Sequence, residues 1–164
     1  MINLARIRNN VWSVFITLFL VACVKQVEPT KKTRSFQATL EKHLDAIKNS
    51  RLDELGPTVS DHVNMISPDG SKIDSKGAFM EFHRNWFNLH NWKWEGKILT
   101  TDSTDSMGYG LIQYRFTQRD SVGNIRFQDN EYLVLIFKKN ADGWQLVLDQ
   151  NTRIQNSKDK STKQ

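Results

Sequence analysis

The hydrophobic periodicity of this chain changes once, from helical spacing to strand spacing, and this change constrains the fold most. Phe36, Leu40, Leu44 and Ile47 recur at helical intervals, and a second helical pattern covers residues 75–89. From Trp92 onward, apolar and polar residues alternate with a period of two through four segments. Helices followed by strands is the order of an α+β fold, in which the helices pack on one side of a sheet.

Shorter signals divide the first half of the folded region. Ser35 is placed to cap the first helix, and a short helix over Leu52–Val59 is interrupted by Gly56-Pro57. The sequence HVNMIS predicts a short strand, and Pro68-Asp69-Gly70 predicts a turn after it. The second long helix carries a wide apolar face, which predicts that it is enclosed by other elements.

The second half predicts an antiparallel meander. Turn-like breaks at 102–106, 120–124 and 140–143 separate the four alternating segments. In the last segment, simple alternation places Gln150 and Thr152 on the same face as Trp144. Asp149 then falls on the opposite face.

The start of the chain predicts export and lipid attachment. Arg6 and Arg8 precede the apolar run Val11–Ala22, which is too short to span a bilayer but has the length of a signal-peptide core. The run ends in LVAC, which resembles the lipobox of bacterial lipoproteins. That resemblance implies cleavage before Cys23, lipid on its thiol and, because Val24 rather than aspartate follows, the periplasmic side of the outer membrane. No second cysteine exists to form an internal disulfide.

Net charge and chain length limit the expected partners and the domain organisation. Residues 1–22 hold two of the 23 basic residues and no acidic residue, which leaves 21 basic and 18 acidic residues and a net charge of +3. The basic residues are scattered, so nucleic acid is not an expected partner. We expect a signal peptide (1–22), a lipid-attached tether (23–33), one folded domain (34–153) and a polar, disordered tail (154–164).

The order of elements resembles the nuclear-transport-factor-2-like superfamily, and within it the SnoaL-like branch. The resemblance rests on DGSKIDSKGAFMEF (69–82), which leads into the second long helix, and on NEYLVLIFKKNADGWQLVLDQNT (130–152), the last hairpin. It implies a cone in which a curved antiparallel sheet wraps around the N-terminal helices and leaves a cavity at its open end. Many relatives carry a histidine six residues after the tryptophan of the last strand, and this chain has Gln150 there.

Catalytic candidates are scattered in the sequence. Gln150 cannot act as a general base near neutral pH, which argues against acid–base catalysis. The superfamily's isomerases and cyclases need a carboxylate base and often a tyrosine, and their activity implies that such groups would face the cavity. The candidates are Tyr114, Tyr132, Asp61, Asp129, Glu131 and Asp149.

Metal and cofactor signals are weak. The four histidines, His43, His62, His83 and His90, lack metal-site spacing, and no phosphate loop or nucleophile elbow occurs, so neither metal nor cofactor is predicted. Aromatic residues gather near residues 82–94, where they can form core or the rim of a pocket. The predicted ligand-binding residues are Trp86, His90, Trp92, Tyr114, Tyr132, Gln150 and Thr152.

These observations favour a non-catalytic, membrane-anchored lipoprotein whose cone-shaped domain binds a small apolar ligand or a protein partner. The alternative is a small isomerase- or cyclase-type enzyme that acts on an apolar carbonyl compound in the cavity. A homodimer is a further expectation, because relatives often pair through the outer face of the sheet. Leu133, Leu135 and Phe137, or else Val134 and Ile136, would supply that face.

Overall fold

A computed structural model describes residues 35–155. The predicted signal peptide, the tether with Cys23, and residues 156–164 of the predicted tail lie outside the described residues. The described part has helices followed by a curved six-stranded sheet with strand order β2-β1-β6-β5-β4-β3. The predicted α+β class and cone-shaped architecture are confirmed.

The first half begins with two capped helices and a short strand pair. Ser35, the predicted cap, and Ser75 accept hydrogen bonds from the backbone N–H groups of Ala38 (3.2 Å) and Ala78 (3.3 Å), and so start the two long helices. Strand β2 is two residues long and was not predicted. The elements are α1 (Phe36–Lys48), α2 (Leu52–Leu55), the 3-10 helix η1 (Gly56–Thr58), β1 (Val59–Ile66), β2 (Lys72–Ile73) and α3 (Lys76–Phe87).

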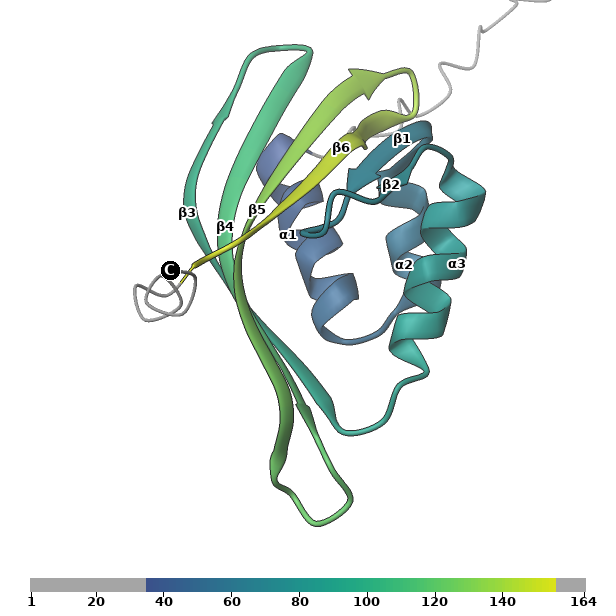
Figure 1. The fold of residues 1–164 in the computed structure, drawn as a ribbon. Coiled ribbons are helices and arrows are strands. Elements are labelled where there is room, and N and C mark those ends of the chain that lie inside the picture. Colours follow the sequence, from purple (N-terminus) through teal and green to yellow (C-terminus); the bar gives the residue numbers. More distant parts are fainter. Residues whose placement is uncertain (1–34, 156–164) are drawn as a thin grey trace, which may run out of the picture. The chain divides into compact units, whose positions relative to one another are not determined.

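The second half is the predicted meander of four long strands. They are β3 (Trp92–Ser103), β4 (Met107–Arg119), β5 (Ile125–Asn140) and β6 (Gly143–Arg153), each antiparallel to the next. Strand β1 then joins the sheet parallel to β6. Figure 1 shows all three α-helices on one face of the sheet, with the β4–β5 hairpin reaching past them.

Helix α1 packs closely against β4 because two glycines of that strand leave room for its side chains. A Cβ atom at Gly108 would lie 2.7 Å from the ring of Phe36, and one at Gly110 would lie 2.9 Å from Leu40. The ring of Phe36 also meets Phe137 and Trp144, with ring centroids 5.8 and 5.4 Å apart. These contacts close the end of the core that lies near the start of α1.

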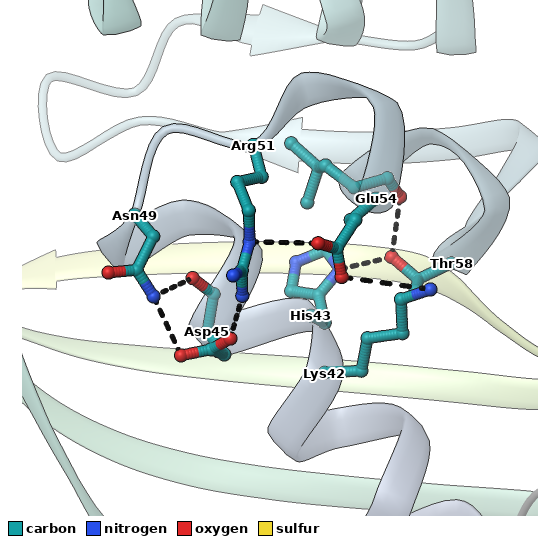
Figure 2. Close-up of polar contacts among 8 residues, drawn as sticks. Lys42, His43, Asp45, Asn49, Arg51, Glu54 and Thr58 are labelled. Carbon is teal, nitrogen blue, oxygen red and sulfur yellow. Dashed lines mark hydrogen bonds and ion pairs between the residues drawn. The ribbon is translucent and has the colours of Figure 1, made fainter.

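A polar cluster ties the end of α1 to α2 (Figure 2). Arg51 pairs with Asp45 and with Glu54, whose Oε1 lies 3.0 Å from the arginine Nε. Asn49 donates to the Asp45 side chain at 2.7 Å. The charges are partly exposed and contribute little stability individually. Beneath them His43 is fully buried, and its Nδ1 lies 2.7 Å from Thr58 Oγ1.

The two faces of β5 differ in burial, and burial decides which residues can contact a partner. Leu133, Leu135 and Phe137 point into the core and are buried, whereas Val134 and Ile136 alternate with them and are half-buried on the outer face. Of the two sets expected to supply a dimer surface, only the second is therefore available. The homodimer itself stays a prediction.

Candidate functional site

A cavity of about 490 Å³ opens between α3 and the inner face of the sheet. Strands β3 to β6 supply one wall, and α3 supplies the other with Phe82, His83 and Trp86. The volume lies within the range of small-molecule sites. Phe82 and Leu89 are 42% and 46% exposed, so apolar side chains line the opening as well as the interior.

Aromatic side chains form much of the wall. Trp86 of α3 contacts Phe116 of β4, with ring centroids 5.9 Å apart, and Phe116 contacts Phe127 of β5 at 6.0 Å. Trp94 stacks on Tyr114 at 5.5 Å and is itself buried. A wall of this kind favours a flat or ring-shaped apolar ligand.

The polar groups of the cavity are concentrated on β4, β5 and β6, where one hydrogen-bonded chain joins four side chains. Asn151 donates through Nδ2 to Asp149 at 2.6 Å and to the Ile66 carbonyl at 3.3 Å. Its amide oxygen accepts from the Tyr114 hydroxyl at 2.9 Å. The Tyr114 hydroxyl is also in short contact with Glu131.

Counting hydrogens along this chain leaves Tyr114 as a donor that faces two acceptors. Both amide hydrogens of Asn151 are used, so its oxygen must face Tyr114 and can only accept. Tyr114 has one hydroxyl hydrogen, and the Asn151 oxygen and the Glu131 carboxylate both face it as acceptors. The Glu131 carboxylate, which is the stronger acceptor, accepts it in the shorter of the two contacts.

Burial sets the protonation of these groups. It raises the pKa of Asp149 to about 7, against the opposing hydrogen bond from Asn151. Burial also raises the pKa of Glu131 above its ordinary value, and the neighbouring Asp129 adds to this. Burial and the hydrogen bond to the Glu131 carboxylate raise the pKa of Tyr114 far above its ordinary value. Near neutral pH, Tyr114 is thus a donor, whereas Asp149 can gain or lose a proton.

Asp149 reaches the cavity because β6 contains a bulge, and the predicted facing of Gln150 is wrong. Phe137 pairs with Leu146 but Ile136 pairs with Leu148, which leaves Val147 as an extra residue. The alternation therefore reverses after Leu146. Asp149, 4% exposed, and Asn151 line the cavity, while Gln150 and Thr152 do not.

Of the predicted ligand-binding residues, the structure brings two to the cavity wall, Trp86 and Tyr114. Trp92 stacks behind Trp86, with centroids 5.0 Å apart, and lines a separate recess of about 300 Å³. His90 is exposed and lies outside the cavity lining, and so does Tyr132, which is 39% exposed.

The candidate catalytic carboxylates fall into two groups, those that line the cavity and one that lies outside it. Asp129, Glu131 and Asp149 line the cavity, whereas the side chain of Asp61 is 85% exposed and pairs with Lys76. Asp129 also forms an ion pair with Arg153 at 2.6 Å. Sequence reasoning missed Asn151, because its role depends on the bulge, and His83, which it treated only as a metal ligand.

No group of three or more metal-ligating side chains occurs within residues 35–155. His43 and His83 are buried, and His62 is exposed on β1. The helices of the same part of the chain are also too short or too polar to cross a membrane.

The comparisons with known proteins give the fold. No family model matches the chain, and no curated protein matches its sequence. A Thiobacillus denitrificans protein described as a candidate calcium/calmodulin-dependent protein kinase type II association domain aligns with a TM-score of 0.62 and 19% identity over 78% of this chain and 100% of its own. A ketosteroid isomerase-like protein from Erwinia carotovora atroseptica aligns at 0.60 and 14% identity, over 73% and 94%.

A third structure carries the family name of the fold. A Streptomyces avermitilis protein of the NTF2-like family, described as a candidate dehydratase, aligns with a TM-score of 0.60 and 9% identity over 73% of this chain and 94% of its own. Identities this low establish architecture and not activity. The described part of the chain therefore has the cone-shaped, nuclear-transport-factor-2-like fold, with a cavity compatible with ligand binding.

Proposed function

We propose that the cone binds a small, largely apolar carbonyl compound and that Asp149 exchanges a proton with the carbon next to the carbonyl group. One observation carries the proposal: the hydrogen-bonded chain Asp149–Asn151–Tyr114–Glu131 lies in a cavity wall that is otherwise mostly apolar. A general base is most effective when its pKa lies near the working pH, and burial raises the pKa of Asp149 to about 7.

The chemistry follows from the positions of these groups. The Asp149 carboxylate takes a proton from the α-carbon, and the electron pair of the broken C–H bond moves toward the carbonyl oxygen as an enolate forms. Tyr114 is the donor available to that oxygen, when its hydroxyl hydrogen turns from Glu131 to the ligand. Return of the proton to the same or another carbon completes an exchange or an isomerisation.

The second candidate function is non-catalytic ligand binding, which the sequence favoured. It depended on Gln150 at the polar end of the cavity, and that residue lies elsewhere. It retains one supporting observation: Asp149 is 4% exposed, and one of its oxygens already accepts from Asn151. A ligand could therefore be held by Tyr114 and the aromatic wall without proton transfer.

Deuterium exchange into 1-tetralone tests the proposal. The full-length protein should bind 1-tetralone and accelerate exchange at its α-carbon in D₂O, and Asp149→Asn should lower that rate by about 100-fold or more. The rate should rise with pH through about 7, as the basic carboxylate forms. Mass spectrometry follows the exchange.

Asp61→Asn is the matched control, because it removes an exposed carboxylate outside the cavity. It should exchange like the unmodified protein. Binding without accelerated exchange would favour the non-catalytic candidate, and absence of binding would contradict the proposed proton transfer.

We further propose that the protein is a lipoprotein held by lipid on Cys23, with the cone at the periplasmic face of the outer membrane. Support comes from the charged start, the apolar run Val11–Ala22 and the small residue before the cysteine. Acyl chains contribute about 0.8 kcal/mol per buried methylene, and more than one chain gives stable anchoring. Cys23→Ser should abolish incorporation of radioactive palmitate in cells, and undiminished labelling would contradict the proposal.

A further inference from the structure

His83 is a polar side chain of the cavity that the proposed proton transfer does not use. It lies on α3, 2% exposed, and contributes to the cavity wall. Its ring lies against Phe79 at 4.2 Å, Phe82 at 5.2 Å and Trp86 at 5.6 Å between centroids. These rings fix the orientation of the imidazole.

The hydrogen bond of His83 determines which of its nitrogens is free. Nδ1 lies 2.9 Å from the carbonyl oxygen of Phe79, which can only accept, so Nδ1 carries the hydrogen. Burial lowers the pKa of His83 to about 4, so the ring is neutral near pH 7 and Nε2 holds a lone pair. Within residues 35–155, no side chain or backbone group hydrogen-bonds to that nitrogen.

His43 provides a contrast within the same core. Its Nδ1 donates to Thr58 Oγ1, because the threonine hydroxyl gives its own hydrogen to the Leu55 carbonyl at 2.6 Å. The Nε2 atom of His43 is enclosed without a partner, and His43 is not part of the cavity lining. Of the two buried histidines, only His83 lines the cavity.

We propose that Nε2 of His83 accepts a hydrogen bond from a hydroxyl or N–H group of the ligand, so that the ligand class is a hydroxylated or amino-substituted apolar carbonyl compound. This inference rests on the proposed function, because it assigns a second polar contact in the same cavity. A neutral acceptor cannot hydrogen-bond a ketone or ether oxygen, so the ligand group at His83 must be a donor.

The acidic side chains of the cavity narrow the class of ligand further. Asp149, Asp129 and Glu131 share the lining with His83, and a carboxylate ligand would be repelled by whichever of them is ionised. The aromatic wall between these acids and α3 suits a ring system. A ring with a carbonyl on one side and a hydroxyl on the other meets both requirements.

The test compares 6-hydroxy-1-tetralone with 6-methoxy-1-tetralone, which lacks the donor. Binding to the full-length protein is followed by tryptophan fluorescence, since Trp86 and Trp94 line the cavity. The hydroxy compound should bind about tenfold more tightly than the methoxy compound, because a buried donor then has its acceptor. His83→Phe should remove this preference, and His83→Gln, which keeps an acceptor, should retain part of it.

His90→Phe is the control, because it removes an exposed histidine outside the lining and should leave the preference unchanged. Thermal melts establish that each variant is folded. Equal binding of the two probes, unchanged by His83→Phe, would overturn the inference and leave the proposed function standing.

Nitrogen-15 NMR of the imidazole rings shows which nitrogen of His83 carries the hydrogen, independently of probe binding. If neither probe binds, the proposed function fails, and the subsite fails with it. A spectrum that shows hydrogen on Nε2 of His83 would overturn the inference whether or not a probe binds, whereas hydrogen on Nδ1 supports it.

Discussion

At the scale of single residues, two glycines lie in opposite environments and predict opposite effects. Gly108→Ala would place a methyl group 2.7 Å from Phe36, whose ring is held by Phe137 and Trp144. The ring cannot move freely, so we expect a loss of about 1–3 kcal/mol in the free energy of unfolding. Urea denaturation measures the change.

Gly77→Ala is the matched comparison. Gly77 lies in the first turn of α3, and a Cβ there meets no atom within 4 Å. Alanine should stabilise the helix by up to about 1 kcal/mol, because glycine has the poorer helix propensity. Equal destabilisation by both substitutions would show that the packing of Phe36 is not what restricts position 108.

At the scale of elements, the sequence predicts most of the fold because most signals are local. The cap at Ser35, the turn at Pro68 to Gly70 and the breaks between strands each depend on a few neighbouring residues. The meander and its burial follow from strict alternation in β4 and β5, which placed Tyr114 correctly. Strand β2 is too short to leave a periodic signal.

The bulge in β6 is different, because no local signal identifies it. Val147 lies between Leu146 and Leu148, and three consecutive aliphatic residues fit either register. Val147 has no partner in the register with β5, and the register between β1 and β6 also shifts, between Val59 and Asn64. A one-residue slip exchanges the faces of all later side chains, so the sequence alone predicted Gln150 in the cavity where Asp149 lies.

The remaining parts of the site also depend on distant partners. The role of Asn151 requires Tyr114 and Asp149 on one wall, and the free nitrogen of His83 requires the Phe79 carbonyl. Sequence reasoning could place Trp86 near a pocket, because helical spacing gives its face. It could not identify which polar groups would meet there.

At the scale of the whole molecule, the buried histidines and Asp149 have opposite effects on how stability depends on pH. Burial lowers the pKa values of His43 and His83 to about 3 and about 4, from 6.5. Between pH 4 and 6.5 the unfolded chain binds these protons and the folded protein does not, so their contribution to stability is lost as pH falls. Asp149, with a pKa raised from 3.8 to about 7, binds a proton only when folded and has the opposite effect.

Asp149→Asn should therefore change how stability depends on pH. Removing the carboxyl removes the proton that the folded protein holds between pH 4 and 7, so acid should destabilise the variant more steeply than the unmodified protein. As pH rises through this window, the unfolding free energy of the variant should increase relative to that of the unmodified protein by on the order of 1.4 kcal/mol per pH unit. Above the window the difference should level off. Urea unfolding at intervals of half a pH unit measures it, with Asp61→Asn expected to follow the unmodified protein. A difference that stays constant with pH would mean that Asp149 is already ionised in the folded protein, and the assignment of a base with a pKa near neutrality would fail with it.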